Sequence, residues 1–170
     1  MKILNSSIYP GPIGNIRIVM DLDTLVFLDF EENIQRCSHH LKKRYVNYSL
    51  REVPCPQPIQ TSFDAYFAGE LGVFKEIKID PSGTLFQKAV WDALQRIPAG
   101  ESRSYSRLAT EIGKPRAARA VGSANANNPI SIMIPCHRVI NQDGQLSGYA
   151  GGTDRQRWLL EHEGALSLQS

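Results

Sequence analysis

The sequence is poor in cysteine, with only Cys37, Cys55 and Cys136 among 170 residues, and it has no apolar run long enough to cross a bilayer. An odd number of cysteines argues against a disulfide framework and favours reduced thiols in a cytoplasm. The segment after Met1 has too few consecutive apolar residues to resemble a signal peptide. These absences argue against a disulfide-rich secreted protein and a membrane protein, and they predict a cytoplasmic location without membrane contact.

Acidic residues are missing from 112–142, although this segment carries Lys114, Arg116, Arg119 and Arg138. The net charge of the whole chain is only +2, so the basic charge is concentrated in this segment. Such a cluster is either a solvated basic face or a site for a polyanionic partner, and its charge alone leaves both readings open.

The pattern of apolar residues changes at Pro81-Ser82-Gly83, which predicts two domains, 1–82 and 83–170. In the first domain we expect strands at 16–20, 24–30 and 76–80 and helices at 31–47 and 59–68. The second domain is predicted to be mostly helical, with capping boxes opening helices at Thr84–Gln87 and Thr153–Gln156. The predicted fold class is therefore α+β.

Two short predicted helices, at 105–112 and after Lys114-Pro115, outline a helix-turn-helix. The second consists mostly of small residues, which allow close approach either to another helix or to nucleic acid. Its arginines, Arg116 and Arg119, are expected one turn apart on one face. Because this helix has no glutamine or glutamate to read base edges, phosphate contact and insertion into a groove are favoured over sequence-specific readout.

The motif I-P-C-H-R places Cys136 directly before His137. A reactive cysteine needs a base or cation that favours its thiolate, whereas most free cysteines are buried core residues. In a strand the two side chains would point to opposite faces, so we expect any contact to pass through water. Glu163 is a candidate to orient the histidine, because a carboxylate in the last turn opposes the helix dipole; Glu161 shares this feature.

Residues 83–164 resemble the O6-alkylguanine-DNA alkyltransferases, the repair proteins that remove alkyl groups from guanine O6. The motifs that carry the resemblance are, in order, G-T-L-F-Q-K-A-V-W, S-Y-S-R-L-A, K-P-R-A-A-R-A-V-G, N-P-I-S-I-M-I-P-C-H-R-V-I, G-Y-A-G-G and W-L-L-E-H-E-G. The resemblance implies an N-terminal domain of ribonuclease H-like outline, with a small antiparallel sheet and helices. It also implies a winged-helix-like C-terminal domain that contains the helix-turn-helix.

The same resemblance implies direct, irreversible and stoichiometric transfer of the alkyl group from O6-alkylguanine in double-stranded DNA to Cys136. His137 and Glu163 would form the relay that deprotonates the cysteine through water. Asn128 would brace the turn that carries the cysteine, and Tyr105 would donate a proton to the departing guanine. O4-alkylthymine remains an open second substrate, and no cofactor is required.

Further positions of the family pattern concern the minor groove and the flipped base. Arg119 would enter the base stack in place of the flipped nucleotide. The other residues expected to contact DNA are Arg116, Ala117, Ala118, Gly122 and Tyr105. The base pocket would be formed by backbone groups of Cys136, Val139, Tyr149 and Ala150, together with Tyr105. Several family members carry serine at the position of Ala150, so a hydroxyl near O6 is missing here.

Two other classes of protein stay open on the residues alone. One is a DNA-binding regulator in which Cys136 is an inert core residue, and the other is a Cys-His-Glu hydrolase. No metal is predicted, because the spacing of Cys37, His39, His40 and Cys55 matches no standard zinc site. The expected form is a monomer, with clustering along DNA as an open alternative.

Overall fold

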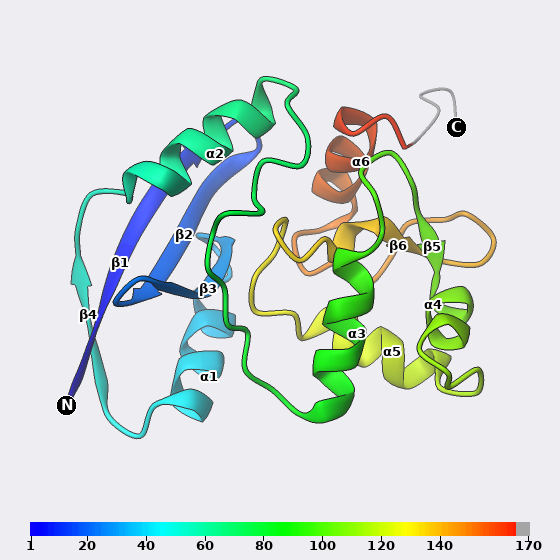
Figure 1. The fold of residues 1–170 in the computed structure, drawn as a ribbon, viewed down its shortest axis with the longest axis horizontal. Helices are drawn as coiled ribbons and strands as arrows, with labels where there is room; N and C mark the ends of the chain where they lie inside the picture. The colour runs from blue at the N-terminus through cyan, green and yellow to red at the C-terminus, as the bar shows by residue number, and fades with distance from the viewer. Residues whose placement is uncertain (166–170) are drawn as a thin grey trace. The chain divides into compact units, whose positions relative to one another are not determined.

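The computed structural model describes residues 1–165, so the last residues of the expected second domain, 166–170, lie outside the described residues. The chain forms two compact units, Met1–Ser82 and Gly83–Ser170 (Figure 1). The α+β fold class is confirmed. Within residues 1–165, no helix has both the length and the apolar character needed to span a membrane.

The N-terminal unit is a four-stranded sheet with two helices (Figure 1). Its elements are β1 (Lys2–Gly11), β2 (Gly14–Asp21), β3 (Thr24–Phe30), α1 (Ile34–Arg44), β4 (Tyr48–Glu52) and α2 (Gln57–Phe67). The strand order is β3-β2-β1-β4, in which β1, β2 and β3 pair antiparallel and β1 and β4 pair parallel. The sheet is thus mixed and not purely antiparallel, because α1 returns the chain so that β4 runs in the same direction as β1.

Two strands of this unit were not predicted. β1 contains the polar run Asn5-Ser6-Ser7, and β4 is mostly exposed, so neither has an apolar pattern typical of a strand. Conversely, the strand expected at 76–80 is reduced to a single bridge between Leu25 and Ile79. Pairing with neighbouring strands outweighs local composition in these segments.

Cys37 belongs to the core of the N-terminal unit. It is buried with Leu4, Val19, Phe27 and Leu41 between the sheet and α1. Burial raises the pKa of its thiol to about 11, with a smaller opposing effect from Arg17. Cys37 therefore has the environment of an unreactive core residue.

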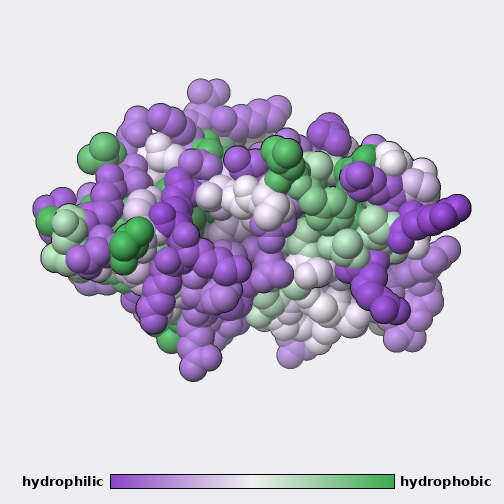
Figure 2. Space-filling model, turned by 90° about the horizontal axis from the view of Figure 1, so that it is seen from below, coloured by the Kyte–Doolittle hydropathy of each residue, from purple (hydrophilic) through white to green (hydrophobic). Residues whose placement is uncertain are grey.

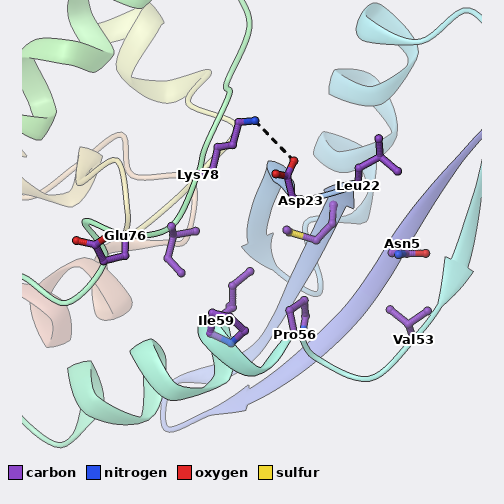
Figure 3. A pocket seen from close by; sticks show the side chains of 11 residues that line it. Asn5, Leu22, Asp23, Val53, Pro56, Ile59, Glu76 and Lys78 are labelled. Carbon is purple, nitrogen blue, oxygen red and sulfur yellow. Dashed lines mark ion pairs between the residues drawn. The ribbon is translucent and has the colours of Figure 1, made fainter.

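A pocket of about 420 Å³ opens within the N-terminal unit (Figure 3). Its lining is largely apolar, with Met20, Leu22 and Ile59 among its residues, and Lys78 pairs with Asp23 at 3.6 Å near its edge. All of its lining residues lie between positions 5 and 78, so it includes none of the site residues predicted from the sequence.

The C-terminal unit packs helices around a short irregular segment that carries the Cys-His motif. Its elements are α3 (Leu85–Gln95), β5 (Arg103–Ser104), α4 (Tyr105–Glu111), α5 (Ala118–Ala126), the 3-10 helix η1 (Cys136–Arg138), β6 (Val139–Ile140) and α6 (Thr153–His162). α3 packs against α4 and α5, and η1 contacts both α3 and α6. The short strands β5 and β6 pair in parallel.

The two predicted capping boxes have different outcomes. The first is confirmed: the Thr84 hydroxyl accepts from the Gln87 N–H at 3.1 Å, and the Gln87 side chain accepts from the Thr84 N–H at 3.0 Å. The second is wrong, because Thr153 is already the first residue of α6 and Gly152 is its N-cap, without a side-chain cap. Gly152 has φ +90, a conformation that favours glycine over threonine at this position.

Candidate active site

The apolar run before Cys136 is a braced turn and not a strand. The Asn128 side chain is fully buried and donates from Nδ2 to the Ile134 carbonyl at 2.8 Å, while its Oδ1 accepts from the Ile130 N–H at 3.0 Å. Ile132, inside this turn, has φ +70, which is costly for a β-branched residue. The two Asn128 hydrogen bonds thus hold a strained turn immediately before the cysteine.

Cys136 and His137 begin the single turn of η1, which corrects the expectation of extended backbone at this point. Both side chains are buried, with Cys136 3% exposed and His137 fully enclosed. The turn is closed by the Val139 N–H, which donates to the Cys136 carbonyl. Because the chain turns here, the opposite-face rule for strands does not apply to the pair.

His137 is held by a carboxylate from the end of α6. Its Nε2 lies 3.0 Å from Oε2 of Glu163, and both side chains are buried. An ionised carboxylate only accepts hydrogen bonds, so Nε2 carries the proton and donates it. In the neutral imidazole, Nδ1 is then the acceptor, and this buried atom has no hydrogen-bond partner among the described residues. The geometry leaves His137 able to take a proton at Nδ1.

Glu163 also receives the guanidinium of Arg138. Nε of Arg138 donates to Oε1 at 2.8 Å, and an Nη donates to Oε2 at 3.0 Å. Burial by itself would raise the pKa of Glu163, but the hydrogen bonds and charges of His137 and Arg138 outweigh it and hold that pKa well below its usual range. The carboxylate therefore stays ionised despite its burial, and its position at the C-terminus of α6 is compensated by these donors.

Arg138 was counted in the sequence only as part of a basic segment. Its guanidinium is turned inward, where it also donates to the Ile97 carbonyl, and its side chain is 13% exposed. Two features of the sequence could have indicated that Arg138 turns inward: it follows His137 directly, and no acidic residue nearby in the sequence neutralises its charge. The pairing with Glu163 spans 25 positions and is not visible in local sequence.

Tyr105 is the first residue of α4, whose N-terminus is capped by the Ser104 hydroxyl accepting from the Arg107 N–H at 3.0 Å. The Tyr105 hydroxyl donates to the Ser147 carbonyl at 3.3 Å, so the side chain reaches the loop that precedes α6. Burial, and secondarily negative charge at Cys136, raise the pKa of Tyr105. The phenol of Tyr105 therefore stays protonated at neutral pH.

α5 has an inner face that packs within the unit and an outer face that is exposed. Its inner face packs within the unit, where Val121 and Ala124 are buried and the Trp91 Nε1 donates to the Ala124 carbonyl at 2.9 Å. Gly122 also faces inward, since a Cβ there would lie 3.7 Å from the Tyr105 ring. The outer face carries Arg119, which is exposed.

In the view of the molecule from below, the C-terminal unit shows an area of white and green residues bordered by purple, hydrophilic ones (Figure 2). Arg116 is exposed as well, but it lies in the turn before α5 and not on its surface. The expectation that Arg116 and Arg119 share one helical face is therefore wrong, because α5 begins only at Ala118. Ala117 is the N-cap of α5, and Ala117 and Ala118 are both half-buried.

The loop between β6 and α6 brings Tyr149 to the histidine. Tyr149 is buried, and its ring makes an edge-on contact with the His137 ring at 6.3 Å between centroids. Ala150 follows it and is half-buried. Within residues 1–165, no three His, Cys, Asp or Glu side chains gather as a metal-ligand set, and the expected absence of a metal stays a prediction.

Two family models match the chain along almost all of its length. Residues 85–165 match the DNA binding domain of 6-O-methylguanine DNA methyltransferase, and residues 5–81 match its ribonuclease-like domain. A methylated-DNA–protein-cysteine methyltransferase of Salmonella typhimurium is 42% identical over 160 residues, which cover 92% of this chain and 94% of the relative. The chain belongs to this methyltransferase family.

Other members of the family agree in sequence and in fold. A methylated-DNA–protein-cysteine methyltransferase of Mycobacterium bovis is 58% identical over 100 residues, 59% of this chain and 60% of the relative. The crystal structure of Mycobacterium tuberculosis OGT in complex with DNA has a TM-score of 0.81 and 40% identity, and the match covers 95% of this chain and 93% of that one. The ribonuclease-like and DNA-binding parts expected from the sequence are thereby confirmed for this methyltransferase.

Proposed function

We propose that this protein repairs DNA by moving the alkyl group of O6-alkylguanine to Cys136 once and irreversibly. The observation that carries the proposal is the buried series Cys136, His137 and Glu163, in which the carboxylate fixes the histidine with its Nδ1 available as a base. Membership of the methyltransferase family supports the reaction, and the solved DNA complex of the relative supports binding to DNA.

In the reaction, His137 Nδ1 takes the thiol proton of Cys136 through a water, and Glu163 stabilises the imidazolium that results. The sulfur then attacks the alkyl carbon, forming a C–S bond while the C–O6 bond breaks and its electron pair stays on the base. Tyr105, whose raised pKa keeps the phenol protonated until the reaction, donates a proton to the departing guanine. The thioether product has no route of hydrolysis by ordinary acid–base chemistry, so the protein works once and needs no cofactor.

A target base inside a duplex must first be rotated out of the stack. We propose that α5 approaches the minor groove through its small residues and that Arg119 fills the space left by the base. The protein acts as a monomer in the cytoplasm, where its three thiols, none of which is in a disulfide, would stay reduced. Clustering along DNA and repair of O4-alkylthymine are further properties to be measured with the same substrates.

The test is transfer of one methyl group. A duplex with a single O6-methylguanine, incubated with excess protein, should raise the intact protein mass by one methyl, and peptide mapping should place it on Cys136. With DNA in excess the reaction should stop after one equivalent, and the same duplex without the methyl group should leave the mass unchanged. Sustained turnover would instead indicate a hydrolase, and tight binding without a mass change would indicate a regulator.

Arg119→Ala should slow repair in duplex DNA roughly ten- to hundredfold, because the unstacking cost of a few kcal/mol loses its partial offset. Repair of the free modified base should change little. Arg116→Ala is the matched comparison, since Arg116 is exposed in the preceding turn and would lose only a phosphate contact, lowering the salt slope of DNA binding by about one. Equal losses for both variants on both substrates would contradict the assignment of Arg119.

Ala150→Ser should narrow the range of alkyl groups that the site accepts. Ala150 is half-buried, follows Tyr149 in the chain and has no hydroxyl, so bulky groups should react at rates close to methyl in the native protein. The measurement is the relative rate for a series of O6-alkyl groups of increasing size, with DNA affinity as the control. Relative rates that do not change with the substitution would refute this role.

A further inference from the structure

Two buried side-chain amides hold the backbone of the Cys136 turn, and no step proposed above uses them. Asn125 on α5 donates from Nδ2 to the Cys136 carbonyl at 3.3 Å. Gln156 on α6 donates from Nε2 to the His137 carbonyl at 3.2 Å and to the Val139 carbonyl at 3.1 Å. Asn125 is 3% exposed and Gln156 is fully buried. We refer to Asn125 and Gln156 as the amide pair.

Filling space does not explain why these two residues are amides. Asn125 Oδ1 and Gln156 Oε1 are buried and have no hydrogen-bond partner among the described residues, which is unfavourable for a polar atom. Leucine or methionine would occupy similar volume without an unpaired oxygen. Gln156 also stands on the same face of α6 as Leu159, Leu160 and Glu163, three, four and seven positions later, where an apolar residue is expected. What the amides supply is donation to the turn's carbonyls.

Those carbonyls include the two that the proposed base pocket uses. The Cys136 and Val139 carbonyls are expected to accept hydrogen bonds from the exocyclic amino group of the flipped guanine. A hydrogen bond weakens steeply when its angle departs from the preferred range, so the orientation of these peptide groups matters. A carbonyl already bound by a buried amide is held in one orientation before the base arrives.

We propose that the amide pair determines specificity for guanine lesions by orienting the Cys136 and Val139 carbonyls toward the 2-amino group. The inference rests on the proposed function and adds two positioning residues to it. It also bears on the second substrate, because O4-alkylthymine has no amino group at the corresponding position. The amide pair would therefore favour the guanine lesion over the thymine lesion.

The experiment compares single-turnover rates for duplexes that carry O6-methylguanine or O6-methylhypoxanthine, which lacks only the 2-amino group. The native protein should react roughly tenfold faster with the guanine lesion, because only that lesion brings a 2-amino donor to the oriented carbonyls and one added hydrogen bond contributes a factor of about this size. Gln156→Met and Asn125→Leu should each bring this ratio to within about twofold of one. Arg157→Met is the matched control, since Arg157 is exposed on the same helix and should keep the native ratio.

The ratio separates a positioning role from a structural one. A variant that is merely less stable would slow both substrates equally and leave the ratio unchanged, which would overturn the proposal. A native protein that does not distinguish the two lesions would overturn it as well, even if neither variant folds. Absence of transfer from either lesion to Cys136 in the native protein would instead refute the proposed function.

Discussion

Replacing Cys136 by serine should abolish alkyl transfer while leaving DNA binding intact. The attacking species is a thiolate, and a serine hydroxyl in the same place is too weak an acid to be ionised by a neighbouring histidine to a useful extent. The two side chains are close in size, and Cys136 is only 3% exposed, so the turn around it should keep its shape. Binding should persist because the proposed DNA contacts lie on α4 and α5.

The measurement is the methyl count on the protein after incubation with the methylated duplex, alongside DNA affinity. Cys55→Ser is the matched control, because Cys55 is a half-buried thiol in the N-terminal unit. Burial raises the pKa of this thiol. It should retain full transfer. Methyl transfer that survives in Cys136→Ser, or that is lost in Cys55→Ser, would show that the acceptor has been misassigned.

Glu163→Gln should slow transfer at neutral pH by about 10²- to 10⁴-fold, the range in which general acid–base groups contribute. The carboxylate accepts from His137 at one oxygen and from Arg138 at both. A glutamine has one oxygen for these donors and turns its NH₂ group toward another, so the histidine loses its fixed tautomer and the buried arginine loses its counter-charge. The rate should fall more than DNA affinity.

Glu161→Gln is the control for this change, because Glu161 lies on the same last turn of α6 but is half-buried. It removes the same charge from the same helix end and should leave the transfer rate within about twofold of native, as surface substitutions usually do. A similar loss in both variants would mean that helix-end charge, and not the contact with His137, is responsible.

Glu163→Gln should also change how the stability of the fold depends on pH. The pKa of Glu163 is lowered in the folded protein, so its ionised form stabilises the fold above the unfolded value of about 4.3, and that contribution is lost as pH falls toward the lower folded pKa. Glu163→Gln should therefore unfold at lower denaturant concentration at pH 7, while the difference from the native protein shrinks in acid. Chemical denaturation at several pH values measures it.

Features that depend on neighbouring residues could be read from the sequence. The capping box at Thr84 placed the start of α3 because both of its hydrogen bonds close within one turn. The ordered motifs identified the family and, with it, the Cys-His pair. In contrast, Gly152 and not Thr153 caps α6, because a residue in the left-handed conformation precedes the helix and no local pattern marked that change of direction.

Contacts between distant positions were decided only by the tertiary structure. β4 joins β1 in parallel because the sheet offers it a free edge, although its own residues are largely exposed. Arg138 pairs with a carboxylate 25 positions away, and Gln156 reaches carbonyls 17 and 19 positions earlier in the chain. The local sequence shows which donors and charged groups exist. An unpaired group is costly to bury, so Arg138 and Gln156 need partners, and the packing of α6 against η1 determines which partners they have.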